Sequence, residues 1–315
     1  MSSGPEPGGG RILLTGATGF VGGHVARELS RRGARLALFA RSEPKARALS
    51  GQGFEVRMGD LTDRDACFRA VAGCDQVLHL AAAADVSDPG VNRRANVDGL
   101  ENLLAACRSA GVNHFTFVSS TCAGRAKRDA YGETKRVGEE RVIASGLPFT
   151  IVRPTMIYGR GSQEFDTFVR VVRLSPIVPL IGDGRNLIQP IFLGDAVAVL
   201  AALADGGRPG AARGATFDLA GPEPVAFDAF VQHVARALGK PRRAILHLPP
   251  APLLLAARIL GRLATHVPLT VDQVLAFLQD TRVDLEPLRR HLGFMPRPLE
   301  QGLPLALSGR TGGGA

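Results

Sequence analysis

The sequence predicts an α/β protein in which a doubly wound, Rossmann-type parallel sheet of about seven strands is joined to a smaller, mostly helical C-terminal lobe. Three observations predict this fold. Short apolar runs alternate with helical patterns, as in a parallel sheet covered by helices on both faces. A glycine-rich turn connects the first apolar run to the first helical pattern. The length of 315 residues suits one large or two modest domains.

The expected strands are short and almost continuously apolar, which is typical of strands buried on both faces. They cover residues 11–15, 35–40, 54–58, 76–80, 113–119, 149–153 and 216–220. Helices are expected where apolar residues recur every three or four positions. These are residues 20–32, 92–111 and 131–145, with further helices near 226–238, 251–264 and 270–279.

Composition excludes several classes of protein. Four scattered cysteines form neither a disulfide framework nor a zinc spacing, so we expect no metal and a reducing compartment. The N-terminus lacks the features of a signal peptide, and no apolar run is long enough to span a bilayer, so a cytoplasmic location is expected. The net charge of +9 comes mostly from arginine, and with two tyrosines and no tryptophan we expect no nucleic-acid partner.

The turn after the first strand has the spacing GxxGxxG. Three glycines at a strand-to-helix junction permit a tight turn, a close approach of backbone to a pyrophosphate and close packing of the helix. The N–H groups at the helix start then face the anion. The residues expected to bind a dinucleotide here are Gly16, Ala17, Thr18, Gly19, Phe20, Val21 and Gly22.

The end of the second strand predicts which dinucleotide is preferred. The acidic residue that would hold the adenosine ribose hydroxyls is missing, and Arg41 and Ser42 stand there instead. A guanidinium pairs with a 2′-phosphate, so we expect NADP in preference to NAD. Asp60, followed by Leu61 after the third strand, is expected to accept a hydrogen bond from the adenine amino group or to cap a helix.

A proton-transfer set is predicted from Tyr131 and Lys135, which are four residues apart and share a helix face. A neighbouring ammonium and an oxidised nicotinamide both favour the phenolate, so we expect Lys135 together with the bound cofactor to lower the pKa of Tyr131. Ser119 and Ser120 stand at the end of the fifth strand, where a serine hydroxyl is expected to hold the oxygen of a substrate. Tyr131, Lys135 and one of these serines are the expected catalytic group.

The order of these motifs identifies a family resemblance. TGATGFVG at 15–22, HLAA at 79–82, NVDG at 96–99, VSS at 118–120, YGETK at 131–135 and RPTMIYG at 153–159 follow one another as they do in the extended short-chain dehydrogenase/reductase superfamily, the NAD-dependent epimerase/dehydratase group. The chain resembles this group over about residues 11–220. The resemblance implies catalytic roles for Ser120, Tyr131 and Lys135, with Lys135 also binding ribose. It further implies cofactor contacts by the backbone of Ala81 and Ala82, by Asn96 and by the loop at Pro154.

The sequence pattern, together with the resemblance, also predicts a division of the chain. Residues 11–170 are expected to form the dinucleotide-binding domain, to which the chain returns at about 188–220. Residues 171–187 and 222–307 are expected to bind the substrate, and residues 1–10 and 308–315 to be disordered tails. A homodimer is a further expectation from the family.

Three functions stay open at this point. The first is NAD(P)-dependent hydride transfer at a secondary alcohol or ketone carbon of a small-molecule substrate, with Tyr131 as general acid or base. The second is sugar-nucleotide epimerisation or dehydration at the same site, although the Tyr-Gly that usually follows the serines is missing. The third is a non-catalytic NADPH-binding module of a membrane complex, since the C-terminal lobe resembles the accessory subunit of respiratory complex I. The apolar stretch 251–264 is expected to lie at a membrane surface, to cover a lipophilic substrate or to belong to the core.

Overall fold

A computed structural model of the chain describes residues 10–84, 88–204, 212–263, 271, 274–275 and 278–308. Most of both expected tails and half of the helix expected at 270–279 lie outside these residues. Two compact units are present. The first comprises the chain up to Arg153, with Val197–Phe217 and Arg290–Gly293, and the second comprises Pro154–Ala196, Asp218–Arg289 and the chain from Phe294.

A seven-stranded sheet forms the centre of the first unit and confirms the predicted fold class. Its strand order is β11-β6-β5-β4-β1-β2-β3, and neighbouring strands from β6 to β3 pair in parallel. The strands are β1 (Ile12–Thr15), β2 (Leu36–Ala40), β3 (Glu55–Met58), β4 (Gln76–His79), β5 (His114–Val118), β6 (Phe149–Pro154) and β11 (Ala215–Leu219). The strand order reverses between β1 and β4, and in open α/β sheets this is where a ligand crevice forms.

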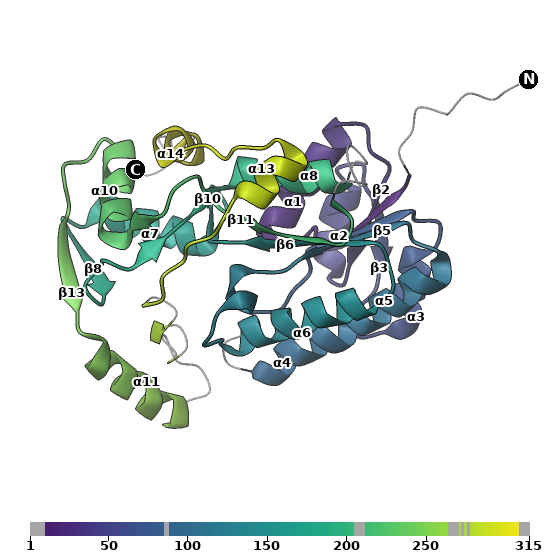
Figure 1. The fold of residues 1–315 in the computed structure, drawn as a ribbon, viewed down its shortest axis with the longest axis horizontal. Helices are drawn as coiled ribbons and strands as arrows, with labels where there is room; N and C mark the ends of the chain where they lie inside the picture. The colour runs from purple at the N-terminus through teal and green to yellow at the C-terminus, as the bar shows by residue number, and fades with distance from the viewer. Residues whose placement is uncertain are drawn as a thin grey trace, which may run out of the picture. The chain divides into compact units, whose positions relative to one another are not determined.

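Helices cover this sheet and bury apolar side chains against it. They include α1 (Phe20–Arg31), α2 (Glu43–Ser50), α3 (Arg64–Val71), α5 (Gly99–Ala110) and α6 (Ala130–Ala144), and the 3₁₀ turn η2 (Thr121–Gly124) packs on α6. Two further helices, α8 (Leu193–Ala204) and α13 (Glu286–Leu292), have residues in both units. Figure 1 shows α5 and α6 side by side along the sheet. Leu100 on α5, Val142 on α6 and Phe115 on β5 are fully buried in one apolar core. This core holds the strand ends of the first unit in fixed positions.

The long helix expected at 92–111 is interrupted. Asp88 caps a short helix, α4 (Pro89–Arg93), which continues into the π-helical segment η1 (Arg94–Asp98) and then into α5. Single π-helical turns are frequent at functional sites. Here η1 carries Asn96, one of the residues expected near the cofactor. Apolar periodicity alone could not show this change in winding.

The second unit contains both helices and short strands. Its elements are β7 (Ile157–Tyr158), α7 (Gln163–Leu174), β8 (Ile177–Ile181), β9 (Leu187–Ile188), β10 (Ile191–Phe192), β12 (Val225–Ala226), α10 (Phe227–Ala237), β13 (Ala244–Leu248), α11 (Pro250–Leu263) and α14 (Leu299–Leu307). Three two-stranded sheets pair β10 with β7, β12 with β9 and β13 with β8. In Figure 1, α10 and α14 lie side by side, and Tyr158 and Phe230 are buried in the apolar core of this unit.

The apolar stretch expected at 251–264 forms α11. Leu255 on this helix is 60% exposed. No helix in the described residues is long and apolar enough to cross a membrane. Contact of α11 with a membrane surface, the cytoplasmic location and the homodimer all stay predictions.

Candidate active site

The glycine-rich turn leaves no room for side chains at two of its positions. Gly16 follows β1 with a φ of +79°, and a Cβ on it would lie 2.6 Å from the main-chain nitrogen of Ala81. A Cβ on Gly22 would lie 2.1 Å from the carbonyl oxygen of Gly16. The turn, the first helix and the chain after β4 therefore pack with backbone against backbone. Only glycine fits this arrangement without moving one of the segments.

The N-terminus of α1 is suited to an anion. Its N-cap residue is Gly19, no side chain caps the helix, and its first turn has no acidic residue. The first N–H groups of a helix have no partner within the helix, and the helix dipole adds partial positive charge there. The phosphate groups of a dinucleotide fit this end.

A cavity of about 210 Å³ opens beside this turn. It is lined by Thr15, Gly16, Thr18, Gly19, Phe39, Ala40, Arg41, Gly59, Asp60, Leu61, Leu80, Ala81, Ala82, Ala83 and Ala95. Eight of the seventeen residues expected to bind the cofactor are in this lining, namely Gly16, Thr18, Gly19, Arg41, Asp60, Leu61, Ala81 and Ala82. The lining does not include the other nine, which are Ala17, Phe20, Val21, Gly22, Ser42, Asn96, Tyr131, Lys135 and Pro154. The cavity thus gathers the ends of β1, β2, β3 and β4 around the glycine turn.

Arg41 and Asp60 face each other in the cavity wall. Nη1 of Arg41 lies 3.7 Å from a carboxylate oxygen of Asp60, and the Arg41 side chain is 74% exposed. Asp60 also accepts hydrogen bonds of 2.9 and 2.8 Å from the main-chain N–H and the hydroxyl of Thr62. Burial raises the pKa of Asp60, but these hydrogen bonds and Arg41 outweigh it and the pKa lies below its usual value. Asp63, and not Asp60, caps α3.

Asn96 holds the chain that follows β4. Its side-chain oxygen accepts a 2.7 Å hydrogen bond from the N–H of Ala83, and its amide donates to the carbonyl of Ala83 at 2.8 Å. The amide also donates to the hydroxyl of Thr134 on α6 at 3.0 Å. Asn96 is only 3% exposed. It therefore connects the cavity wall to the helix that carries Tyr131.

Thr15 and His79 form a second polar contact under the cavity. The Thr15 hydroxyl lies 2.7 Å from Nδ1 of His79 and accepts a 3.2 Å hydrogen bond from the N–H of Ala81. His79 is fully buried and stacks on Phe117. Burial, with a smaller contribution from Lys135, lowers the pKa of His79 to about 3. The imidazole is thus neutral near pH 7, and this contact fixes the ends of β1 and β4 relative to each other.

The three residues expected to be catalytic come from neighbouring segments. Ser120 caps the 3₁₀ turn η2, where its hydroxyl accepts a 3.2 Å hydrogen bond from the N–H of Cys122. Tyr131 is in the first turn of α6, and the next residue must be glycine because a Cβ on Gly132 would lie 2.9 Å from the carbonyl oxygen of Cys122. This close packing of η2 on α6 brings the segments of Ser120 and Tyr131 together.

Lys135 is buried on the same helix. Its Nζ donates a 2.8 Å hydrogen bond to the carbonyl of Val118 and lies 4.9 Å from the centre of the Phe117 ring and 5.8 Å from that of Tyr131. Burial lowers the pKa of Lys135 to about 8, although the nearby carboxylate of Glu139 raises it.

In the protein without a cofactor, Lys135 does not lower the pKa of Tyr131, and the joint effect expected of Lys135 and an oxidised nicotinamide stays a prediction. Burial raises the pKa of Tyr131 above its usual value, and Cys122 and Asp129 raise it further. The reason is geometric: the Lys135 ammonium is held at the Val118 carbonyl, 5.8 Å from the centre of the phenol ring. The phenol is therefore protonated at neutral pH, which is the form that donates a proton.

Ser119 is engaged elsewhere. Its hydroxyl donates a 2.5 Å hydrogen bond to Glu139, which also forms an ion pair with Arg153. Ser119 is 4% exposed, so its hydroxyl is held within the protein. This leaves Ser120 as the serine of the pair that stands next to the α6 N-terminus. Pro154, the last residue of β6, belongs to the second unit, and its role beside a cofactor stays a prediction.

Several residues that shape this site escaped the sequence reasoning. Thr15 and Thr134 lie within the motifs TGATGFVG and YGETK but were given no role, and Glu139 lies outside the motifs. Two of them had a positional signal: Thr15 directly precedes the first glycine, and Glu139 follows Lys135 by four residues on the same helix face. The polar group of each is bound inside the first unit, as the distances above show.

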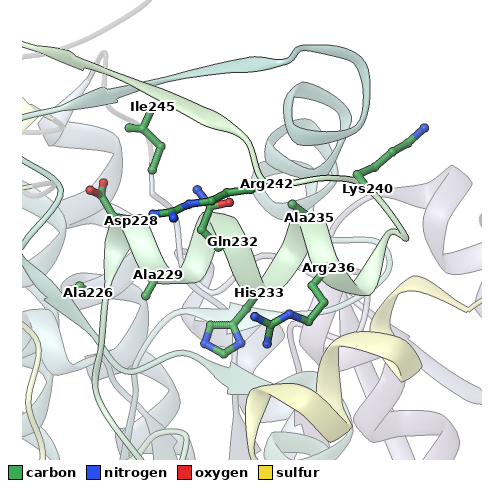
Figure 2. A pocket seen from close by; sticks show the side chains of 10 residues that line it. All are labelled: Ala226, Asp228, Ala229, Gln232, His233, Ala235, Arg236, Lys240, Arg242 and Ile245. Atoms are coloured by element: carbon green, nitrogen blue, oxygen red, sulfur yellow. The ribbon is translucent and has the colours of Figure 1, made fainter.

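A larger cavity of about 660 Å³ lies in the second unit, along α10. Figure 2 shows its lining, in which Arg236 and Lys240 point in different directions and Arg242 lies over Gln232. Because these basic side chains do not point towards one place, they do not form a defined site for an anion. Among the described residues no group of three or more His, Cys, Asp or Glu side chains is placed to hold a metal ion.

Comparison with known proteins agrees with this geometry. The NAD dependent epimerase/dehydratase family matches residues 12–215. The 2-alkyl-3-oxoalkanoate reductase of Stenotrophomonas maltophilia (strain K279a) is 29% identical over 93% of this chain and 97% of its own. The 3 beta-hydroxysteroid dehydrogenase/Delta 5-->4-isomerase of Mycobacterium tuberculosis (strain CDC 1551 / Oshkosh) is 32% identical over 73% of this chain and 70% of its own.

A solved structure shows the same fold. UDP-glucose 4-epimerase of Thermus thermophilus, in complex with NAD, superposes with a TM-score of 0.70 at 21% identity, over 94% of this chain and 97% of the other. The sheet order, the glycine turn and the match over residues 12–215 lead to one conclusion: the chain belongs to the NAD dependent epimerase/dehydratase family, whose members are NAD(P)-dependent oxidoreductases, epimerases and dehydratases.

Proposed function

We propose that this enzyme reduces a ketone, or oxidises the corresponding secondary alcohol, with NADP(H) as its preferred cofactor and NAD as the alternative. One observation carries the proposal. The packing of η2 on α6 brings Ser120 and Tyr131 together, and the buried cation of Lys135 lies on the same helix face as the phenol. The hydroxyl groups of Ser120 and Tyr131, beside the positive charge of Lys135, are suited to transferring a proton to or from a substrate oxygen.

Each residue has a distinct task in this proposal. The Ser120 hydroxyl donates a hydrogen bond to the ketone oxygen and orients it. The nicotinamide supplies the hydride that reaches the carbonyl carbon. Tyr131 donates its phenolic proton to the oxygen as negative charge develops there, and takes a proton back in the reverse direction. The Lys135 ammonium stabilises the phenolate that results.

The cavity of the first unit fits the other end of the cofactor. We assign the pyrophosphate to the N–H groups between Gly16 and Gly22 and the 2′-phosphate to Arg41. Arg41 is the cation at the end of β2, and its exposed guanidinium reaches Asp60 only at 3.7 Å, which leaves its hydrogen-bond donors available. Asp60 and Leu61 then face the adenine.

The names of two relatives support a proposal for the substrate class. These names specify a 3-oxoalkanoate and a 3β-hydroxysteroid, so both relatives act at an oxygen-bearing carbon of a largely apolar compound. We therefore propose an apolar ketone or secondary alcohol as substrate. The competing readings, a sugar-nucleotide epimerase and a non-catalytic NADPH-binding module, are outcomes of the same test.

The test is an assay of NADPH oxidation at 340 nm with a panel of ketones: a 2-alkyl-3-oxoalkanoate, a 3-oxosteroid and a short-chain ketone as control. The proposal expects turnover of at least one apolar ketone, which Tyr131→Phe abolishes while NADPH still binds. Turnover of a UDP-sugar without net NADPH oxidation would establish the epimerase, and NADPH binding with no turnover of any ketone or sugar would establish the module.

A further inference from the structure

A buried ion pair lies behind the proton-transfer residues. Glu139 of α6 accepts hydrogen bonds from Nε and Nη2 of Arg153 on β6 at 2.8 and 2.5 Å, and from the Ser119 hydroxyl at 2.5 Å. The Glu139 side chain is only 5% exposed, whereas that of Arg153 is 30% exposed. The negative member of the pair is thus inside the protein, and the positive member reaches solvent.

The spacing places this carboxylate next to the lysine. Tyr131, Lys135 and Glu139 follow one another at intervals of four residues on α6, so they share one face of the helix. Lys135 is 2% exposed. A buried ammonium favours losing its proton unless dipoles or an opposite charge stabilise the charged form.

Two groups supply this stabilisation. The carbonyl of Val118 accepts a hydrogen bond from the ammonium, and the carboxylate of Glu139 contributes an attractive charge. Other groups around Lys135 act differently: His79 on β4 is neutral, and burial keeps the Tyr131 phenol protonated. The positive charge of Arg153 on β6 opposes the charged form of Lys135, but the guanidinium also binds the Glu139 carboxylate. Asp129 and Cys122 raise the pKa of Tyr131.

We propose that Glu139 is a positioning residue for the reaction: its buried carboxylate keeps the Lys135 ammonium charged inside the protein. Arg153 and Ser119 hold that carboxylate in place. Without it, Lys135 becomes neutral at physiological pH and no longer stabilises the phenolate of Tyr131. The inference rests on the proposed function for its consequence in catalysis, but the effect on Lys135 itself is a property of the protein alone.

The chain permits a direct measurement of this effect because it has only four lysines. We suggest labelling the protein with ¹³C-lysine and following the Cε signals by NMR from pH 6 to 11. The replacements Lys45→Arg, Lys127→Arg and Lys240→Arg assign the three other signals. The titration of Lys135 is then read without any substrate or cofactor.

Two variants separate charge from shape. Glu139→Gln keeps the shape and removes the charge, and Glu139→Asp keeps the charge on a shorter side chain. Glu140→Gln is the matched control, because Glu140 is the next residue on α6 and binds Arg136 at the surface. We expect the titration of Lys135, near pH 8 in the wild type, to fall by about one pH unit or more in Glu139→Gln, a tenfold change in its protonation equilibrium. It should move much less in Glu139→Asp and stay unchanged in Glu140→Gln.

An unchanged Lys135 titration in Glu139→Gln would overturn the proposal, as would equal shifts in the Gln and Asp variants, which would indicate a structural role. If Glu139→Gln does not fold, the double variant Glu139→Gln/Arg153→Gln removes both charges and leaves no buried ion without a partner. Because Arg153 opposes the ammonium, the double variant is expected to lower the Lys135 titration in the same direction but by less than Glu139→Gln, and no shift in it would also contradict the proposal.

The consequence for catalysis is measured separately. Once a ketone substrate is found, the pH profile of kcat in Glu139→Gln should lose its upper limb about one unit earlier than in the wild type, with KM little changed. If no ketone is turned over, the proposed function fails while the NMR result stands. If ketones are turned over but Lys135 titrates normally in Glu139→Gln, the role of Glu139 fails alone.

Discussion

Lys135 donates a 2.8 Å hydrogen bond to the carbonyl oxygen of Val118, the last residue of β5. The bond ties the middle of α6 to the strand that leads directly into Ser119 and Ser120. Helix and strand therefore cannot shift independently, and the serine segment and Tyr131 keep a fixed separation. Much of the site geometry follows from this one contact.

The phenol of Tyr131 is predicted to be essential for turnover and dispensable for binding. Tyr131→Phe removes one oxygen from a partly exposed ring and should lower kcat by about 100- to 10,000-fold, the usual contribution of a general acid. NADPH affinity, measured by fluorescence titration, should change little. A variant that retains wild-type kcat would show that another group supplies the proton.

Arg41 is predicted to determine the cofactor preference. Arg41→Ala should weaken NADPH binding by about 1.5–3 kcal/mol, the range for a hydrogen bond to a charged group, and leave NADH binding nearly unchanged. Calorimetric titration with both cofactors gives the comparison, and Arg47→Ala, on the exposed side of α2, is a suitable control. Equal loss for the two cofactors would remove Arg41 from the 2′-phosphate site.

Gly22 is predicted to tolerate no side chain. Gly22→Ala places a Cβ 2.1 Å from the carbonyl oxygen of Gly16, so the turn must move. We expect a loss of about 1–3 kcal/mol in the free energy of unfolding, typical of overpacking, together with weaker dinucleotide binding. Gly33→Ala is a control with open space around its Cβ but a positive φ. The Gly33→Ala protein should be less stable but should bind the cofactor as the wild type does. Equal cofactor affinities in Gly22→Ala and Gly33→Ala would contradict the role of Gly22 in dinucleotide binding.

His79 is predicted to make the protein sensitive to acid. Its pKa is about 3 when folded, against 6.5 as the reference value, so the unfolded chain binds a proton that the folded chain does not between these values. The free energy of unfolding should therefore fall as the pH drops from about 6.5 towards 3. His79 alone should contribute a decrease of about 1.4 kcal/mol per pH unit. Urea unfolding at several pH values tests this, and His79→Asn should have a shallower slope. A slope identical to that of the wild type would assign the acid sensitivity to other groups.

The sequence predicted the sheet and the glycine turn well because both depend on local patterns. Apolar strands such as β1 and β5, and the helix α6, are apparent from residue type and spacing. The short helices α2 and α3 were missed, since eight residues give little periodicity. The β8–β13 pair was also missed, because strands far apart in the chain pair through contacts that local patterns do not encode.

The candidate site was predictable only in part. Tyr131, Lys135 and Ser120 were found from spacing and from the family resemblance. The direction of the Tyr131 pKa shift was not, because it depends on burial and on where the Lys135 ammonium is held. Glu139 was not predicted for a related reason. Its carboxylate is held by hydrogen bonds from Arg153 and Ser119, which belong to other segments of the chain.

The central claim is that a nicotinamide delivers hydride to a carbonyl carbon beside Tyr131. Deuterium transfer tests it most directly: the enzyme is incubated with an apolar ketone and with NADPH that carries deuterium at both hydrogen positions of C4 of the nicotinamide, and the product alcohol is analysed by mass spectrometry. The account predicts deuterium on the carbinol carbon with the wild type, and with Tyr131→Phe the same product formed about 100- to 10,000-fold more slowly. Across the ketone panel, product without deuterium, or no product at all, would contradict it.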